Sequence, residues 1–360
     1  MLVSGFSRIT QTARIAACAV LGISLIIGTS IAEAKPLDPI SEGELYDRLA
    51  KLQHMPWSGK SLERPSGWFS GCRKSTVTLT VGDPLTMEYR DLDVVLIRPD
   101  SNKPVPVSMV LPTMDGVTAV ERAIASNLCA MNVAAIIADV NQNTVPEEIP
   151  SWGFEDQNNR RAILSLRTII DYIEGTPYFD SRKIGMIGSS LGGVTTSFMA
   201  GIEPQRISAF VIVVGGGNIP YTLSVSDNEK ILELRRRRMA AEGLTDPEHY
   251  EDKLREILKF DPMYFASFAV RDKIFMALSR SDTKVPTLVQ EDLFRAFGEP
   301  EHTVFNVGHV STVIGMAFFY FDYVSDFLSK RFGIPALRKR IQQPVDELAT
   351  LSLPMPQFQY

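Results

Sequence analysis

The sequence predicts an α/β protein built on a mostly parallel, doubly wound sheet. Three observations carry this prediction: near-continuous apolar runs of strand length, helical spacing of apolar residues between them, and a 45% apolar content. Strands that are apolar at nearly every position are typical of a sheet covered by helices on both faces. The chain of 360 residues is long for one domain, but single α/β domains reach about 250 residues or more.

The N-terminal residues 1–34 have the three parts of a secretory signal peptide. Arg8 and Arg14 precede the uncharged run "IAACAVLGISLIIGTSIA", which leads into the A-x-A site Ala32-Glu33-Ala34. An uncleaved membrane anchor is the alternative, because 18 apolar or small residues nearly span a bilayer. The glycines and small residues of the run favour cleavage. We therefore expect an exported protein, periplasmic or secreted, that contacts a membrane only if this segment is retained.

Residues 35–74 are expected to form an N-terminal arm laid over the domain. They contain the amphipathic stretch "ELYDRLAKL" and then "MPWSGKSLERPSGWFSG", which is rich in Pro, Gly and Trp. The main domain is expected to span residues 75–331. Its first two strands have no helix between them, so we expect an antiparallel edge there.

The elements of the main domain follow from apolar periodicity along the chain. The expected strands are 75–81, 89–99, 104–112, 133–140, 183–188, 207–216, 273–280 and 303–308. The expected helices are 118–131, 159–175, one starting at about residue 191, and a final helix over roughly 311–331.

Residues 219–262 interrupt this alternation. They are rich in charge and helix formers, and they fall between two core strands near the carboxyl edge of the sheet, which favours a helical lid. The run Arg235 to Arg238 could bind an anionic substrate or lipid, but a solvated helix face paired with acids is the interpretation we favour. Residues 332–360, with three prolines after position 343 and weak periodicity, are expected to be a loosely docked extension.

Composition excludes several function classes. A formal charge of −5 argues against nucleic acid as the main partner. Four histidines and three cysteines, with no Cys-x-x-Cys or His-Glu-x-x-His, give no metal site, and no cofactor is expected. After export, Cys72 and Cys129 would be the two remaining cysteines, and either a disulfide or two unpaired core residues fits the sequence.

A candidate nucleophile lies in "KIGMIGSSLGGVTTS", residues 183–197. Of the two serines only Ser190 fits G-x-S-x-G, because it lies between Gly188 and Gly192. In this motif a sharp strand-to-helix turn presents the serine at the top of a sheet, and glycines are needed where a Cβ would clash. An apolar strand before the motif and a small-residue helix start after it provide the expected context.

A serine nucleophile needs a base and an acid, which follow it in the order Ser, acid, His in this type of fold. His309 comes directly after the last strand, whereas His249 lies in the expected lid and His302 at the start of that strand. Asp282 comes at the end of the preceding strand, where it would orient the imidazole. The simpler interpretations are a loop histidine and an aspartate that caps the next helix.

An oxyanion hole requires two backbone N–H donors. One is expected from Leu191, the residue after the nucleophile, and the other from the loop "LPTMDGVT", where we choose Met114 with Thr113 as the alternative. The other known position for the acid, after the strand 207–216, holds Asn218, which cannot carry the charge.

With these residues the chain resembles the α/β-hydrolase superfamily over roughly residues 75–331. The stretch "LRTIIDYIEGTPYFDSRKIGMIGSSLGG" resembles the dienelactone hydrolase, acetyl xylan esterase and prolyl-oligopeptidase-like branch, as do "DPMYFA" and "SDTKVP". Many members of that branch carry His-Gly after the third strand, where this chain has Pro112-Thr113, so the oxyanion geometry departs from the pattern.

The sequence thus predicts an exported serine hydrolase that cleaves carboxylic esters of small molecules through an acyl-enzyme. The resemblance leaves a serine peptidase or acyl-aminopeptidase as the alternative, and a non-catalytic binding protein on the same fold as a further one.

Overall fold

A computed structural model describes residues 34–141 and 151–337 of the chain. The expected signal peptide and most of the expected C-terminal extension lie outside these residues. Among the described residues, no helix is both long enough and apolar enough to span a membrane.

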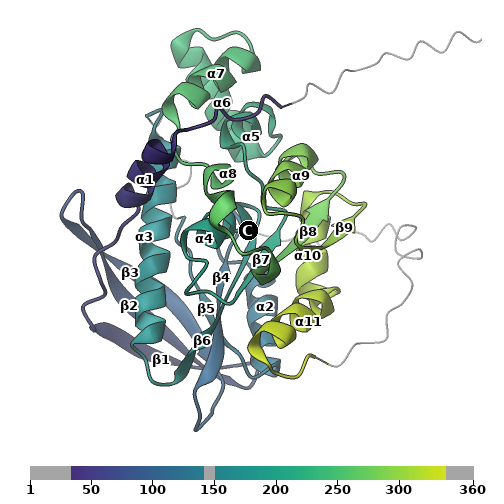
Figure 1. The fold of residues 1–360 in the computed structure, drawn as a ribbon. Coiled ribbons are helices and arrows are strands. Elements are labelled where there is room, and N and C mark those ends of the chain that lie inside the picture. The colour runs from purple at the N-terminus through teal and green to yellow at the C-terminus, as the bar shows by residue number, and fades with distance from the viewer. Residues whose placement is uncertain (1–33, 142–150, 338–360) are drawn as a thin grey trace, which may run out of the picture. The chain divides into compact units, whose positions relative to one another are not determined.

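The core is a mixed sheet in which the described residues contribute nine strands (Figure 1). Their order across the sheet is β1-β2-β3-β5-β4-β6-β7-β8-β9. The pairs β1/β2, β2/β3 and β3/β5 are antiparallel, and the remaining pairs are parallel. The strands are β1 (Ser61–Phe69), β2 (Cys72–Asp83), β3 (Glu88–Arg98), β4 (Val105–Leu111), β5 (Ala134–Ile137), β6 (Phe179–Ser189), β7 (Ala209–Val213), β8 (Ile274–Ser279) and β9 (Glu301–Phe305). The predicted parallel sheet with an antiparallel edge is confirmed.

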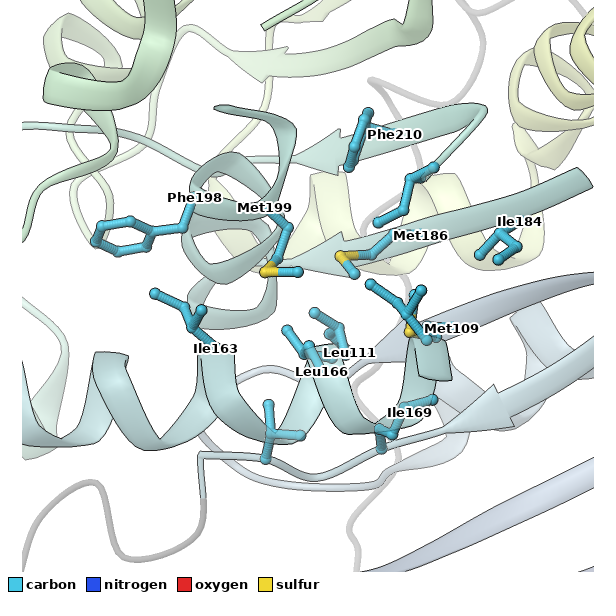
Figure 2. Packing of buried hydrophobic residues seen from close by; sticks show 14 of the residues in the cluster. Met109, Leu111, Ile163, Leu166, Ile169, Ile184, Met186, Phe198, Met199 and Phe210 are labelled. Carbon is cyan, nitrogen blue, oxygen red and sulfur yellow. The ribbon is translucent and has the colours of Figure 1, made fainter. Parts of the chain in front are cut away.

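Helices cover both faces of the sheet (Figure 1). One face packs against α3 (Phe154–Glu174) and α4 (Leu191–Ile202), and the other against α2 (Ala119–Ala130), α10 (His309–Phe318) and α11 (Phe321–Phe332). Figure 2 shows part of the first of these cores, in which Leu166 and Ile169 of α3 lie toward Met109 and Met186 of the central strands. In the same view Ile163 of α3 lies toward Phe198 of α4. Because both faces are buried, the central strands are apolar at nearly every position, which is the pattern that predicted them.

The N-terminal segment differs from the prediction in its second half. Residues expected to belong to an arm form β1, which pairs antiparallel with β2 at the edge of the sheet. β1 is exposed along nearly its whole length, so it lacks the apolar alternation that would reveal a strand. The segment before it, including α1 (Glu42–Lys51), does lie over the domain: Arg160 and Arg167 of α3 donate to the backbone carbonyls of Lys51 and Leu52.

The C-terminal helix also differs from the prediction. A single helix is expected over 311–331, but the structure has α10 and α11, with a break at Phe319 and Tyr320. Both of these residues donate their N–H to the Gly315 carbonyl, which ends α10. Neither glycine nor proline occurs at the break, so the sequence carries no signal for it.

Cys72 and Cys129 form a disulfide that joins the start of β2 to the end of α2. The sequence left this pairing open. The bond closes a separation of 57 residues, which removes conformational freedom from the unfolded chain.

Residues 219–262, which we call the lid, connect β7 to β8. They form α5 (Ile219–Val225), α6 (Glu229–Glu242), α7 (Pro247–Ile257) and the start of α8 (Pro262–Phe265). The lid has its own small apolar cluster, centred on Leu223, Ile231, Tyr250 and Leu254. Another helix, α9 (Thr287–Ala296), follows β8.

Candidate active site

Ser190 occupies a strained turn between β6 and α4. Its backbone has φ 56° and ψ −118°, a conformation that costs a non-glycine residue about 1–3 kcal/mol and that concentrates at functional sites. The flanking glycines explain how the turn closes. A Cβ on Gly188 would lie 2.0 Å from the Gly192 carbonyl oxygen, and a Cβ on Gly192 would lie 2.4 Å from that of Leu111. The turn can therefore form only with glycine at both positions.

Hydrogen bonds and close packing fix the height of this turn above the sheet. The Ser190 N–H donates to the Val213 carbonyl of β7 at 2.9 Å. Gly193 and Gly215 pack against each other, and a Cβ on Gly215 would lie 2.6 Å from the carbonyl carbon of Gly193. No sequence pattern singles out these two glycines, because their role appears only when α4 and the end of β7 are brought together.

Asp282 and His309 are in contact. The distance from His309 Nδ1 to Asp282 Oδ2 is 2.7 Å, and the two residues are buried, with 5% of Asp282 and 9% of His309 exposed. The other carboxylate oxygen accepts the N–H groups of Lys284 and Val285, both at 2.9 Å. Because a carboxylate only accepts, Nδ1 carries the proton and Nε2 is left with a free lone pair, as a general base requires.

Gln290 of α9 holds the acid from the far side. Its Nε2 donates to Asp282 Oδ2 at 2.9 Å and to the Val285 carbonyl at 2.7 Å, while its Oε1 accepts the Ser279 N–H at 3.1 Å. The side chain is fully buried. This residue was not predicted, and a glutamine eight positions after an acid carries no signal that would find it. Asp282 does not cap α9, which begins after Pro286 without a side-chain cap.

Ser190, Asp282 and His309 all follow the carboxyl ends of parallel strands. Backbone hydrogen bonds continue the sheet at this level, from the Ser190 N–H to β7, from Val214 to Ala277 of β8, and from Arg280 to Phe305 of β9. From His309, α10 runs back to pack against β8, β7 and α2. No hydrogen bond joins Ser190 Oγ to His309 over the described ranges. Such catalytic contacts are often long in ligand-free enzymes.

The two expected oxyanion donors lie at the same edge. Leu191 is the first residue of α4, and Met114 lies in a turn closed by the bridge between Thr113 and Gly116. Neither the Leu191 nor the Met114 N–H has an acceptor among residues 34–141 and 151–337. From the lid, Lys230 Nζ donates to the Met114 carbonyl at 3.1 Å. Both predicted donors are thus available at the cavity that Ser190 lines.

The other histidines lie elsewhere and make other contacts. His302 packs against an aromatic ring of α9. His249 pairs with Asp246 in the lid, and His54 pairs with Asp171 beneath the N-terminal segment. In the part of the chain that the structure describes, no group of three or more metal-ligating side chains is present.

The arginine run of the lid is largely used internally. Arg235 donates to two lid carbonyls, Arg236 pairs with Glu233, and Arg238 pairs with Glu155 of α3 at 2.8 Å. Arg238 is one of the most buried side chains in the described chain. The anion-binding alternative for this run therefore has no support from these three residues.

A cavity of about 110 Å³ lies beside Ser190, between the sheet edge and the lid. Its apolar wall includes Ile219, Leu223, Ile231 and Leu234 of the lid. Its polar wall includes Glu155, Asn158 and Asn159 of α3, with Asn141 after β5. Burial raises the pKa of the Glu155 carboxyl, and its Arg238 partner opposes this shift.

Comparison with known proteins gives one partial family match. The family model described as "BAAT / Acyl-CoA thioester hydrolase C terminal" matches residues 167–285. This is less than half of the chain, and it includes Ser190 and Asp282 but not His309. No curated protein matches the sequence.

Solved structures with a similar fold include two acetyl xylan esterases. The enzyme from Paenibacillus sp. R4 has a TM-score of 0.64 at 16% identity, covering 83% of this chain and 97% of that chain. Acetyl xylan esterase 1 from Thermoanaerobacterium sp. JW/SL YS485 has a TM-score of 0.56 at 16% identity, with 83% and 96% covered. The acylaminoacyl peptidase of Pyrococcus horikoshii has a TM-score of 0.50 at 12% identity, with 77% of this chain and 50% of that chain covered.

Proposed function

We propose that this chain, which has the α/β-hydrolase fold, is a serine hydrolase that cleaves carboxylic esters through an acyl-enzyme. The observation that carries the proposal is the strained backbone of Ser190, at the same sheet edge as the buried His309–Asp282 pair. Strain of this kind persists only where the surrounding structure enforces it, and here it lifts a hydroxyl out of the turn.

In the first half of the reaction, Ser190 Oγ attacks the ester carbonyl while His309 Nε2 takes the hydroxyl proton. The Leu191 and Met114 N–H groups stabilise the charge that develops on the carbonyl oxygen. Asp282 keeps the imidazole in the required tautomer and stabilises its protonated form. His309 then gives the proton to the departing alcohol, and the acyl group stays on Ser190.

In the second half, His309 takes a proton from a water molecule, which attacks the acyl carbonyl. The tetrahedral intermediate collapses, the proton returns to Ser190 Oγ, and the carboxylic acid leaves. Both halves of the reaction therefore need only the three candidate catalytic side chains, the two backbone N–H donors, water and the substrate.

Labelling with a fluorophosphonate tests the nucleophile. We expect wild type and Ser189→Ala to be labelled and Ser190→Ala to remain unlabelled, because the probe reacts only with an activated serine. Ser189 is a matched control, since it is the preceding residue and is buried. Equal labelling of wild type and Ser190→Ala would contradict the proposal.

Hydrolysis of acyl-CoA thioesters is a second candidate, favoured by the partial family match. A thioester and an oxygen ester carrying the same acyl group separate the two: a higher kcat/KM for the thioester would favour the second candidate. Aminoacyl anilides test the peptidase alternative. A higher kcat/KM for these anilides than for esters would favour a peptidase over an esterase. A folded protein that turns over none of these and resists labelling would be a binding protein.

We also propose that the protein is exported and that residues 1–34 are removed. The disulfide between Cys72 and Cys129 supports export, because such bonds persist in oxidising compartments. Protein recovered after export should begin at Lys35 by intact-mass measurement. A full-length chain in the membrane fraction would favour the anchor instead.

A further inference from the structure

The cavity beside Ser190 has amide side chains on its polar wall. Asn158 and Asn159 are consecutive residues in the first half of α3, and both line the cavity. Asparagine is a poorer helix former than alanine by about 0.7 kcal/mol. Two of them in succession therefore have no helical advantage.

Neither amide is used to hold the protein together. Asn159 is only 9% exposed, yet its side chain has no hydrogen-bond partner within residues 34–141 and 151–337, and the same is true of Asn158. The amide atoms of Asn159 are not among the fully enclosed unpartnered polar atoms of the described chain, and the residue lines the cavity, so the amide opens onto the cavity. An amide that lines a cavity in this state is available to a ligand.

Other asparagines nearby show the contrast. The Asn141 Nδ2 donates to Thr195 Oγ1 at 3.2 Å. The Asn218 side chain donates to the Lys35 carbonyl and accepts from Arg255, which ties three segments together. These amides have structural partners, whereas those of Asn158 and Asn159 do not.

The charged residue on the same wall is already paired. Both oxygens of the Glu155 carboxylate accept from Arg238, at 2.8 and 3.2 Å. The free hydrogen-bonding groups of α3 at this wall are therefore neutral amides, each with donors and an acceptor. A hydroxyl group, which also donates and accepts, matches them better than a carboxylate or an alkyl group.

We propose that Asn159, supported by Asn158, forms a subsite that binds a hydroxyl substituent of the substrate while its ester carbonyl is held at Ser190. This inference rests on the proposed ester hydrolysis. The lid wall, with Leu223, Ile231 and Leu234, takes the apolar part of the same substrate. The site thus selects short esters that carry both an alkyl portion and a hydroxyl group.

Two pairs of isosteric esters test the subsite. For the acyl side, p-nitrophenyl 3-hydroxybutyrate is compared with p-nitrophenyl 3-methylbutyrate. For the alcohol side, 2-hydroxypropyl acetate is compared with 2-methylpropyl acetate. Wild type should favour the hydroxylated member of at least one pair by about tenfold in kcat/KM, the effect of one well-placed hydrogen bond.

The variant Asn159→Leu should lose this preference. Its kcat/KM should fall about tenfold for the hydroxylated ester and should not fall for the alkyl ester of the same pair. Its melting temperature should stay the same or rise, because leucine is a better helix former and the change removes no side-chain hydrogen bond within the described residues. Gln157→Leu is the matched control on the exposed face of α3, and it should leave kcat/KM unchanged for both esters.

Equal rates for both members of both pairs in wild type would overturn the subsite. So would an Asn159→Leu variant that unfolds at lower temperature and slows all esters alike, since this would mean a structural role. Preference for an ester with a carboxylate in place of the hydroxyl would overturn it as well. If wild type hydrolyses none of the four esters, the proposed function itself fails, which is a distinguishable result.

Discussion

At the residue scale, the backbone conformation of the candidate nucleophile requires glycine, which has no Cβ, two residues before and two residues after it. Ser190 keeps a positive φ because Gly188 and Gly192 have no Cβ to block the approach of β6, α4 and the end of β4. The site is therefore built by close backbone packing as well as by the three polar side chains.

Replacing Gly188 by alanine tests this dependence. The new Cβ would lie 2.0 Å from the Gly192 carbonyl oxygen, and overpacking of this kind costs about 1–3 kcal/mol or more. We expect the free energy of unfolding to fall by at least about 2 kcal/mol and kcat/KM to fall by about 100-fold or more as the turn opens. Urea unfolding and ester turnover measure the two effects.

Gly43→Ala is the control for this variant. Gly43 is an exposed residue of α1, and a Cβ added there would meet nothing within 4 Å, so alanine should leave activity unchanged and raise stability by up to about 1 kcal/mol. Comparable losses in both variants would show that close packing at the turn is not the cause.

Gln290 is expected to position the acid. Gln290→Leu removes a hydrogen bond to Asp282 Oδ2 and should lower kcat by about tenfold, with little change in KM. In an Asp282→Asn background the same change should have almost no further effect, because the residues act as a unit. Additive losses of kcat in the double variant would mean that Gln290 does not act through Asp282. Glu291→Gln on the exposed side of α9 is the control.

At this scale the sequence predicted the candidate catalytic side chains but not the side chains that contact them from other elements. Ser190, Asp282 and His309 could be predicted because a motif, a chain order and strand ends specify their places. Gln290, Asn159 and Lys230 could not, because each matters through contacts between elements that are distant in the chain.

At the element scale, the lid is connected to the expected oxyanion loop. Lys230 at the start of α6 donates to the Met114 carbonyl and pairs with Asp115 at 2.8 Å. These contacts hold the peptide next to the Met114 N–H, so the position of α6 bears on that donor. We therefore expect Lys230 to be a positioning residue.

Lys230→Met should lower kcat by about fivefold with KM nearly unchanged, since a partly exposed ion pair contributes about 1 kcal/mol or less. Lys230→Arg should recover most of the loss. High salt should lower wild-type kcat toward that of the methionine variant, because exposed charge pairs are screened. A change in KM with kcat unaffected, or a failure of Lys230→Arg to restore kcat, would show that the Lys230 contact does not act through the oxyanion loop.

Helices and strands could be predicted from the sequence where they are buried, because burial makes apolar residues recur with a regular spacing. The central strands and the helices on the two faces follow their apolar patterns, whereas β1 is exposed and bears no such pattern. The division of the last helix into α10 and α11 depends on how Phe319 and Tyr320 bond to Gly315, which no local residue preference encodes.

At the scale of the described domain, two carboxyls at the base of the lid make stability depend on pH. Asp261 is buried and links the two ends of the lid, whereas the partly buried Asp156 of α3 links the lid to the body. Asp261 accepts the N–H groups of Asn218, Ile219 and Met263. Asp156 accepts the N–H groups of Lys259 and Phe260, which follow α7. Burial raises the pKa of each carboxyl to about 6, from an ordinary value of 3.8.

Because the folded state holds these protons more tightly, their contribution to stability is present below pH 3.8 and is lost as the pH rises to about 6. For the fully buried Asp261 the loss is of order 3 kcal/mol. The stability of Asp261→Asn should therefore fall less than that of wild type between pH 4.5 and 7 in urea unfolding. The exposed Asp47→Asn should keep the wild-type slope, and an unchanged slope in Asp261→Asn would contradict this assignment.

The proposed mechanism requires one serine that accepts the acyl group of the substrate. The most direct measurement is mass spectrometry of the wild-type protein quenched during turnover of a p-nitrophenyl ester, followed by mapping of the added mass. We expect an acyl group on Ser190 that disappears when the ester is exhausted. Steady turnover with no added mass on the protein, or with the acyl group on a different residue, would contradict the mechanism.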